Sequence, residues 1–200
     1  DGKIKYSVIK IGKDTEHFQN KKIIIASELV KKVSEECNFK EFKVLKEFSG
    51  NDFKNTVCQH PFLSLGYDYE VPMLQGDFVT LEQGTGVVHM APSHGPDDFN
   101  LCLKHGLKAP DTMNDSGIYS KAIPFFSGMH IFKADPVIID KLSACKSLLG
   151  NGKLQHSFPH SWRSKAPLVY RATPQWFISM EKNNLREKAL KAIDDTAFYP

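Results

Sequence analysis

Alternating apolar and polar positions near the start of the chain predict β-structure. Residues 4–11 carry apolar side chains mainly at every second position, which is the pattern of a half-buried strand. The apolar run 23–26 predicts a short buried strand, and Ser27 is placed to cap a following helix that extends to Cys37. Residues 42–48 alternate again and predict another strand.

The middle of the chain predicts further strands and then two helices. Residues 57–90 contain short apolar runs separated by glycine and proline, a spacing typical of a barrel or a sandwich. Pro96 suits the first turn of a helix of about ten residues. A second amphipathic helix is expected to open at Asp135 and to end before Gly150.

The carboxyl-terminal part predicts strands at 168–170 and 176–178, followed by a helix over 181–193 in which apolar residues recur at helical spacing. The sequence contains no internal repeat and no low-complexity segment. Taken together, the pattern predicts a β-rich α+β domain.

Composition places the chain among globular domains and adds few functional signals. Its 200 residues are 41% hydrophobic and 24% charged, which suits one ordinary domain with a buried core. The net charge of +3, from 26 Lys and Arg against 23 Asp and Glu, is too small to indicate nucleic-acid binding by itself. The four cysteines form no CxxC pair, which favours a reducing compartment.

Targeting signals are also missing from the sequence. It has neither a charged-then-apolar leader nor an uninterrupted apolar run of roughly 18 residues, so nothing indicates secretion or membrane spanning. Because the chain begins at Asp1 and not at a methionine, we expect it to be a piece of a longer protein.

Candidate chemical groups concentrate between residues 84 and 98. The glycines there allow a backbone to approach a ligand closely, and a strand expected from Val87 would deliver a histidine to the same place. A carboxylate in the first turn of a helix is stabilised in its ionised form, so Asp98 or Asp97 suits an ammonium group at neutral pH. The candidate residues are Gly84, Thr85, Gly86, His89, His94, Asp97 and Asp98.

Simpler interpretations of the same residues remain open at this point. The two aspartates can act only as helix caps, and His89 can be an ordinary core histidine. Thr85 can be a turn residue, and His94 a loop residue that supports others. A metal site built from the histidines and aspartates is a further alternative, although their spacing matches no zinc signature. GxSxG, Walker and GxGxxG sequences are all absent.

Three stretches of the sequence resemble the editing domain of the isoleucyl-tRNA synthetases, the insertion known as connective peptide 1. They are residues 76–98, which contain GTGVVHMAP, residues 126–134, and residues 159–177, which end in RATPQWF. His89 followed by Ala91 and Pro92 looks like the isoleucine enzyme, because the valine and leucine relatives usually lack a histidine there. The form resembles bacterial or organellar members.

The resemblance implies a fold, a division of the chain and a reaction. The fold is a barrel-like sheet with peripheral helices, in which residues 1–180 form the editing domain and residues 181–200 lead back toward the catalytic core. The reaction is hydrolysis of mischarged valyl-tRNA(Ile) by attack of a positioned water on the aminoacyl ester. In this scheme Asp98 binds the α-ammonium group, His89 excludes the larger isoleucine side chain, and Thr85 belongs to the catalytic group. Gly84, Gly86 and His94 complete the substrate-binding set.

The resemblance also implies partners and the absence of cofactors for editing. No metal is expected at the editing site, whereas the parent ligase uses ATP and Mg²⁺ to join isoleucine to tRNA(Ile). The implied partners are the 3′ end of tRNA(Ile) with its valyl ester and the rest of the synthetase. The protein is expected to be a monomer that binds no membrane, in the cytoplasm or, for an organellar form, the mitochondrion.

The sequence departs from the family pattern in one important respect. Its seven threonines form no run, so the threonine-rich segment that begins this domain in the family is missing. HIGH and KMSKS sequences are absent too, which leaves ATP-dependent charging to the parent ligase. The alternative function is therefore a fragment that binds the tRNA 3′ end without turnover.

A second group of residues combines positive charge with aromatic rings. Arg163, Lys165 and Arg171 are interleaved with Trp162 and Tyr170, a mixture that can hold phosphates and stack on bases. The alternative, for Trp162, Arg163, Gln175 and Trp176, is that they serve packing and a hinge where the insertion of the family returns to the core.

Overall fold

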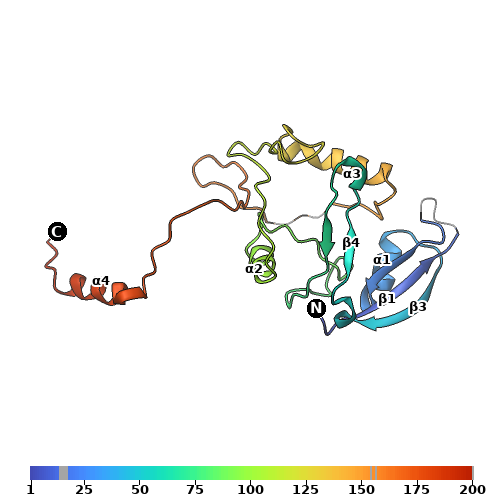
Figure 1. Cartoon of the computed structure of the whole chain (residues 1–200), viewed down its shortest axis with the longest axis horizontal. Coiled ribbons are helices and arrows are strands. Elements are labelled where there is room, and N and C mark those ends of the chain that lie inside the picture. The colour runs from blue at the N-terminus through green and yellow to red at the C-terminus, as the bar shows by residue number, and fades with distance from the viewer. Residues whose placement is uncertain (14–17, 154, 156, 200) are drawn as a thin grey trace.

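The computed structural model describes residues 1–13, 18–153, 155 and 157–199 (Figure 1). Its amino-terminal part is a three-stranded antiparallel sheet with the strand order β2-β1-β3. The strands are β1 (Lys5–Ile11), β2 (Lys22–Ala26) and β3 (Phe42–Ser49). The register between β1 and β3 shifts between Val8 and Ile9, as at a β-bulge. The strands predicted from alternation at this end are therefore confirmed.

One helical segment covers this sheet and closes the main core. It consists of the short 3-10 helix η1 (Ser27–Leu29) and α1 (Val30–Glu36). The prediction that Ser27 caps the helix is wrong. Its hydroxyl group is instead paired with the Ser7 hydroxyl at 2.8 Å. The core contains Tyr6, Ile9, Ile25, Ala26, Leu29, Val30 and Val33. Burial of these apolar side chains is the main stabilising term for this part of the chain.

The centre of the chain forms fewer strands than its glycine and proline spacing predicts. After the 3-10 helix η2 (Gly50–Phe53), a two-stranded antiparallel sheet pairs β4 (Val57–Gln59) with β5 (Glu70–Pro72), and η3 (Leu63–Leu65) lies between them. No strand is assigned between residues 73 and 95, all of which lie in the described part. The strand predicted from Val87 is therefore wrong.

Helices follow where the caps and apolar spacing predicted them. α2 (Pro96–Lys104) begins with a proline in its first turn, and α3 (Ala134–Ala144) follows the 3-10 helix η4 (Ile131–Lys133). Proline suits the first turn because its missing N–H group would have no partner there.

The carboxyl-terminal part leaves the body as an extended tail that ends in a helix (Figure 1). The tail carries η5 (Lys182–Asn184) and α4 (Leu185–Asp194), which confirms the predicted helix. Residues 168–170 and 176–178 are not strands. A strand needs a neighbouring strand as the hydrogen-bond partner of its backbone groups. The side chains at 176–178 are almost fully exposed along the tail, so packing does not favour a sheet there.

The fold class is thus α+β, with two small sheets and four α-helices in the described ranges. None of the helices in these ranges is long and apolar enough to span a lipid bilayer.

Candidate functional site

The turn at Gly84, Thr85 and Gly86 is fixed to the amino-terminal sheet by two hydrogen bonds. The Ala26 N–H group donates to the Thr85 carbonyl oxygen at 2.8 Å. The Tyr6 hydroxyl donates to the Gly86 carbonyl oxygen at 2.7 Å, and burial raises the pKa of Tyr6. The sheet therefore determines where this turn lies.

The two glycines of the turn are required for different reasons. Both have positive φ, +74° at Gly84 and +76° at Gly86, which favours glycine. A Cβ atom at Gly86 would lie 2.5 Å from the Cβ of Ala26, whereas a Cβ at Gly84 would meet no atom within 4 Å. Gly86 thus permits close packing against β2. Gly84 leaves open space beside the backbone, where a ligand can approach.

Thr85 contributes its side chain to the turn itself. Its hydroxyl oxygen accepts a hydrogen bond from the Val87 N–H group at 3.3 Å and donates to the Val87 carbonyl at 3.2 Å. These contacts suit the turn-residue interpretation, and a direct role of Thr85 in catalysis stays a prediction.

His89 is exposed, and its charge influences His60, whose ring packs with those of Phe62, Tyr67 and Tyr69. The pKa of His60 is lowered, first by burial and second by the charge of His89. The His60 ring stacks on Tyr67 with 4.7 Å between centroids. The Phe62 N–H group donates to His60 Nδ1 at 3.0 Å, so that nitrogen carries no proton. His89 is therefore not the core histidine of the simpler interpretation.

Asp98 lies in the first turn of α2 and reaches back to the loop before the helix. Its Oδ2 atom accepts a hydrogen bond from the Ala91 N–H group at 2.8 Å. Neither Asp97 nor Asp98 is the N-cap, because Gly95 holds that position and no side chain caps the helix. Asp97 is exposed and Asp98 half-buried, and among the described residues the Oδ1 atom of Asp98 has no partner. The capping alternative is therefore wrong for both aspartates.

His94 joins three segments that are far apart in the sequence. Its Nδ1 atom lies 2.9 Å from the Tyr170 carbonyl oxygen, which can only accept, so Nδ1 donates. Its Nε2 atom lies 2.8 Å from the Thr112 hydroxyl oxygen. Both ring nitrogens thus have protein partners, which suits a residue that supports the loop better than one that binds substrate.

The buried Ser93 strengthens the same junction. The Ala172 N–H group donates to the Ser93 carbonyl oxygen at 2.8 Å, and the Ser93 hydroxyl donates to the Pro110 carbonyl. The loop that leads to Asp98 is therefore hydrogen-bonded to two distant segments, at Pro110 and at Ala172.

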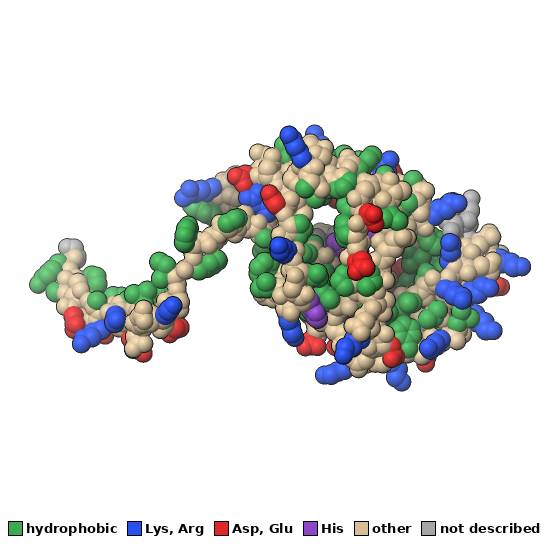
Figure 2. All heavy atoms as spheres, in the orientation of Figure 1, with side chains coloured by type: hydrophobic (Ala, Val, Ile, Leu, Met, Phe, Trp, Pro, Cys, Tyr) green, Lys and Arg blue, Asp and Glu red, His purple; other side chains and the backbone are tan. Residues whose placement is uncertain are grey.

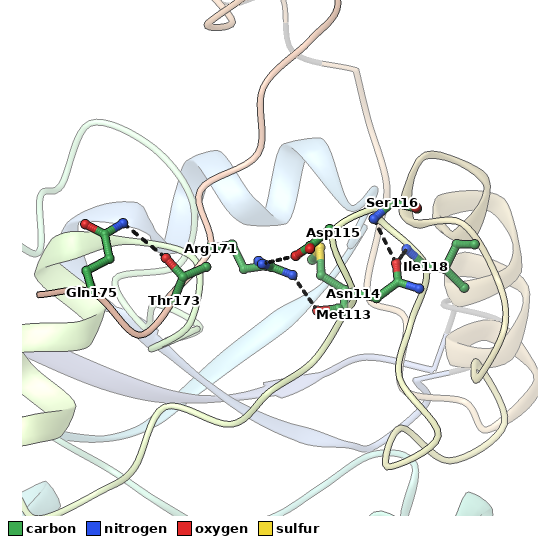
Figure 3. Close-up of polar contacts among 8 residues, drawn as sticks. All are labelled: Met113, Asn114, Asp115, Ser116, Ile118, Arg171, Thr173 and Gln175. Atoms are coloured by element: carbon green, nitrogen blue, oxygen red, sulfur yellow. Dashed lines mark hydrogen bonds and ion pairs between the residues drawn. The ribbon is translucent and has the colours of Figure 1, made fainter.

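Arg171, which lies between Tyr170 and Ala172 in the sequence, anchors their segment next to a turn at Asn114 (Figure 3). Its guanidinium group donates to the Met113 carbonyl oxygen at 3.1 Å and to the Asp115 carboxylate. Asn114 Oδ1 accepts from the N–H groups of Ser116 and Ile118 at 3.0 and 3.1 Å, which fixes the turn.

Two cavities lie near these residues. A cavity of about 60 Å³ behind the glycine turn is lined by Tyr6, Gly86 and Met90 among others. A larger one of about 380 Å³ is lined by Arg171, Asp115 and Phe132 among others. His89 lines neither cavity.

The structure brings the predicted residues together only in part. Within the described ranges, no three His, Cys, Asp or Glu side chains gather closely enough to hold a metal ion. Sequence reasoning missed Tyr6 and Ala26, which fix the glycine turn, and His60, whose pKa is lowered in part by His89. No local pattern marks them, because their partners lie far away along the chain.

Comparison with known proteins supplies the family. No protein-family model matches the chain. Isoleucine–tRNA ligases match nearly all of it: the protein of Pelagibacter ubique is 62% identical over 98% of this chain and 21% of its own length. The Gluconobacter oxydans protein is 42% identical over 98% of the chain and 22% of its own length.

A third relative, from Shewanella piezotolerans, is 39% identical over 100% of the chain and 20% of its own length. The chain spans about a fifth of the length of these curated relatives. Identity extends over the whole chain and is not confined to the glycine turn and its surroundings. The chain therefore belongs to the isoleucine–tRNA ligase family.

Proposed function

We propose that residues 1–180 form the editing domain of an isoleucine–tRNA ligase and hydrolyse the ester of valyl-tRNA(Ile). Residues 181–200 would lead back to the catalytic core, and the sheets described above would be parts of the barrel-like sheet of that domain. The relatives support the parent family, and the arrangement around Asp98 supports the reaction.

The observation that carries the proposal is the hydrogen bonding of the Asp98 carboxylate. One of its oxygens is held by the Ala91 N–H group, and the other has no partner among the described residues. Asp98 lies in the first turn of α2 and is half-buried, so its carboxylate has a fixed position. A carboxylate is the natural partner of the α-ammonium group of an aminoacyl ester.

The chemistry demands little of the protein once the ester is positioned. Water attacks the carbonyl carbon and loses a proton, the resulting tetrahedral intermediate expels the ribose oxygen of the terminal adenosine, and that oxygen takes up the proton, directly or through solvent. An aminoacyl ester is already activated, so orientation and stabilisation of the oxyanion can supply most of the acceleration. Backbone N–H groups of the turn at 84–86 are our candidates for oxyanion stabilisation.

Selectivity for valine over isoleucine would come from steric exclusion. A difference of one methylene changes binding by only about 1–3 kcal/mol, and isoleucyl-tRNA synthetase is itself the standard example of that limit. A second site that rejects the larger side chain is therefore needed. His89, which is exposed and whose charge influences His60, is our candidate for the wall that rejects isoleucine.

ATP and Mg²⁺ would serve the ligation reaction of the parent and not this chain. HIGH and KMSKS sequences, which belong to the ligation site of the family, are absent from this sequence. The proposed editing reaction uses neither cofactor.

The test is deacylation of valyl-tRNA(Ile) and isoleucyl-tRNA(Ile) by this chain and by a full-length ligase that contains it. Asp98→Asn keeps an oxygen that can accept from Ala91 but removes the charge. A hydrogen bond to a charged group contributes about 1.5–3 kcal/mol, so hydrolysis of the valyl ester should slow roughly ten- to a hundredfold. Asp97→Asn is the matched control, because this exposed neighbour makes no such contact.

The expected result is that the ligase clears the valyl ester, spares the isoleucyl ester and depends on Asp98 but not on Asp97. If the folded ligase clears neither ester, or if Asp98→Asn hydrolyses at the normal rate, the hydrolase proposal fails. Binding of the tRNA 3′ end without turnover is then the better description.

A further inference from the structure

Packing restrains the turn at residues 84–86 where Gly86 lies against Ala26, but it leaves space on either side of that contact. A Cβ atom at Gly84 would meet no atom within 4 Å. The cavity of about 60 Å³ borders Gly86 and Val87. Because empty space supplies no van der Waals contacts, the orientation of the turn depends strongly on the hydrogen bonds that it receives.

One of these hydrogen bonds comes from a side chain that is itself held firmly. Hydrophobic side chains gather where the amino-terminal sheet meets the centre of the chain (Figure 2). Tyr6 on β1 belongs to the core of this sheet and is only 2% exposed. Its ring lies edge-to-face with Phe53 at 4.9 Å between centroids and stacks near Phe48 at 6.1 Å. A buried tyrosine hydroxyl needs a partner, and here that partner is the Gly86 carbonyl oxygen at 2.7 Å.

The bond from Tyr6 also orients the groups that follow Gly86. A peptide unit is planar, so fixing the Gly86 carbonyl group fixes the N–H group of Val87 as well. That N–H group donates to the Thr85 hydroxyl oxygen at 3.3 Å. The hydroxyl of Tyr6, the peptide unit after Gly86 and the side chain of Thr85 therefore form one chain of hydrogen bonds, and such bonds strengthen one another.

The same turn keeps backbone donors available. Among the described residues, the N–H groups of Gly84 and Thr85 donate to no acceptor within hydrogen-bond distance. Gly84 is exposed, and the space beside it is open. Stabilisation of an oxyanion requires donors of this kind that are already fixed in direction before the reaction begins. The direction of the two N–H groups depends on how the turn is held.

We propose that Tyr6 is a positioning residue for the editing reaction. Through the Gly86 carbonyl group it holds the turn in the orientation in which the N–H groups of Gly84 and Thr85 stabilise the oxyanion. Tyr6 is buried, so it acts through Gly86 and not by contact with the ester. The inference rests on the proposed function, in which this turn supplies the oxyanion donors. Because the oxyanion forms only as the ester reacts, displacement of the turn slows the chemical step without weakening substrate binding.

The test is Tyr6→Phe in a full-length ligase that contains this chain. The substitution keeps the ring and its contacts with Phe48 and Phe53, and it removes only the hydroxyl group. Deacylation of valyl-tRNA(Ile) is measured over a range of substrate concentrations to give kcat and KM. A small displacement of a catalytic group can slow a reaction by about a hundredfold, so kcat should fall roughly 10- to 100-fold. KM should stay unchanged, and kcat/KM should fall by the same factor as kcat.

Tyr67→Phe is the matched control. The Tyr67 hydroxyl donates to the Pro124 carbonyl oxygen at 3.0 Å, so this variant also loses one hydrogen bond from a tyrosine to a distant carbonyl group. Both variants should lose a similar amount of stability in urea unfolding, but Tyr67→Phe should keep the kcat of the wild type. NMR gives a direct check on the turn: the carbonyl carbon resonance of Gly86 should shift in Tyr6→Phe and not in Tyr67→Phe.

Three results would overturn the inference: a normal kcat in Tyr6→Phe, an equal loss of kcat in Tyr6→Phe and Tyr67→Phe, or a loss that appears only in KM. Asp98→Asn separates this failure from failure of the proposed function. If the wild type clears the valyl ester and Asp98→Asn slows it while Tyr6→Phe does not, only the role of Tyr6 is refuted. If the wild-type ligase leaves the ester intact, the proposed function fails and the role of Tyr6 fails with it.

Discussion

Replacement of Gly86 by alanine tests whether the glycine turn is packed against the amino-terminal sheet. The new Cβ would lie 2.5 Å from the Cβ of Ala26, which is fully buried at the end of β2. Neither partner can move freely, because Ala26 donates a hydrogen bond to Thr85 and Tyr6 donates one to Gly86. The overlap must therefore be relieved by shifting backbone.

The magnitude follows from two contributions. A residue with a Cβ at positive φ costs about 1–2 kcal/mol. An added methyl group in a packed site costs a further 1–3 kcal/mol or so. Gly86→Ala should therefore reduce the free energy of unfolding by about 2–5 kcal/mol, a large share of the roughly 5–15 kcal/mol of an ordinary domain.

Gly84→Ala is the matched control for this substitution. It has almost the same φ, +74° against +76°, but no atom lies within 4 Å of its Cβ position. Both variants share the backbone cost and the loss of chain entropy in the unfolded state, so their difference isolates the close approach to Ala26. That difference should be about 1–3 kcal/mol.

The assay is urea unfolding followed by circular dichroism. With a slope of about 2 kcal/mol per molar urea, the midpoint of Gly86→Ala should fall roughly 1 M below that of Gly84→Ala. Equal midpoints would refute the reasoning, since they would mean that Gly86 does not lie against Ala26. An unchanged stability in both variants would also refute the positive φ of the turn.

Two further predictions concern titrating groups in the aromatic cluster. Burial lowers the pKa of His60, and the charge of His89 lowers it further, so His89→Ala should raise this pKa, as measured by NMR titration of the His60 ring protons. An unchanged pKa would mean that the charge of His89 does not act on His60. Burial, followed by Tyr69 and Tyr119, raises the pKa of Tyr67 to about 12. Since the pKa is 10.0 in the absence of these effects, the stability of the wild type relative to Tyr67→Phe should be constant below about pH 10 and fall between pH 10 and pH 12. Thermal unfolding of both proteins across this pH range measures the difference in their stability. A difference that does not change with pH would contradict the burial of Tyr67.

Local patterns in the sequence predicted the elements that depend on near neighbours. The proline and aspartates at 96–98 predicted the start of α2, and the alternation at 4–11 predicted β1. The prediction of strands at 168–170 and 176–178 is wrong, because an apolar run by itself does not supply the neighbouring strand that its backbone groups need. Ser27 does not cap the helix, because its hydroxyl group is paired with that of Ser7 on β1.

The candidate site was predicted as a list of residues but not as an arrangement. The cluster between 84 and 98 was identified from glycines, histidines and aspartates that lie within a few residues of each other. Its anchoring could not be identified in this way. His94 was assigned to the substrate, whereas the structure gives its two ring nitrogens partners at Thr112 and Tyr170.

By itself, the sequence determined the fold class, most helix positions and the family, because these depend on short-range periodicity and on motifs that are continuous in the chain. Only the tertiary structure decided how the site is held. The bond from Tyr6 to Gly86 joins residues 80 positions apart, and the contact of His94 with Tyr170 joins residues 76 positions apart. Such contacts form only when distant segments of the chain pack against each other, so no pattern within a few residues can encode them.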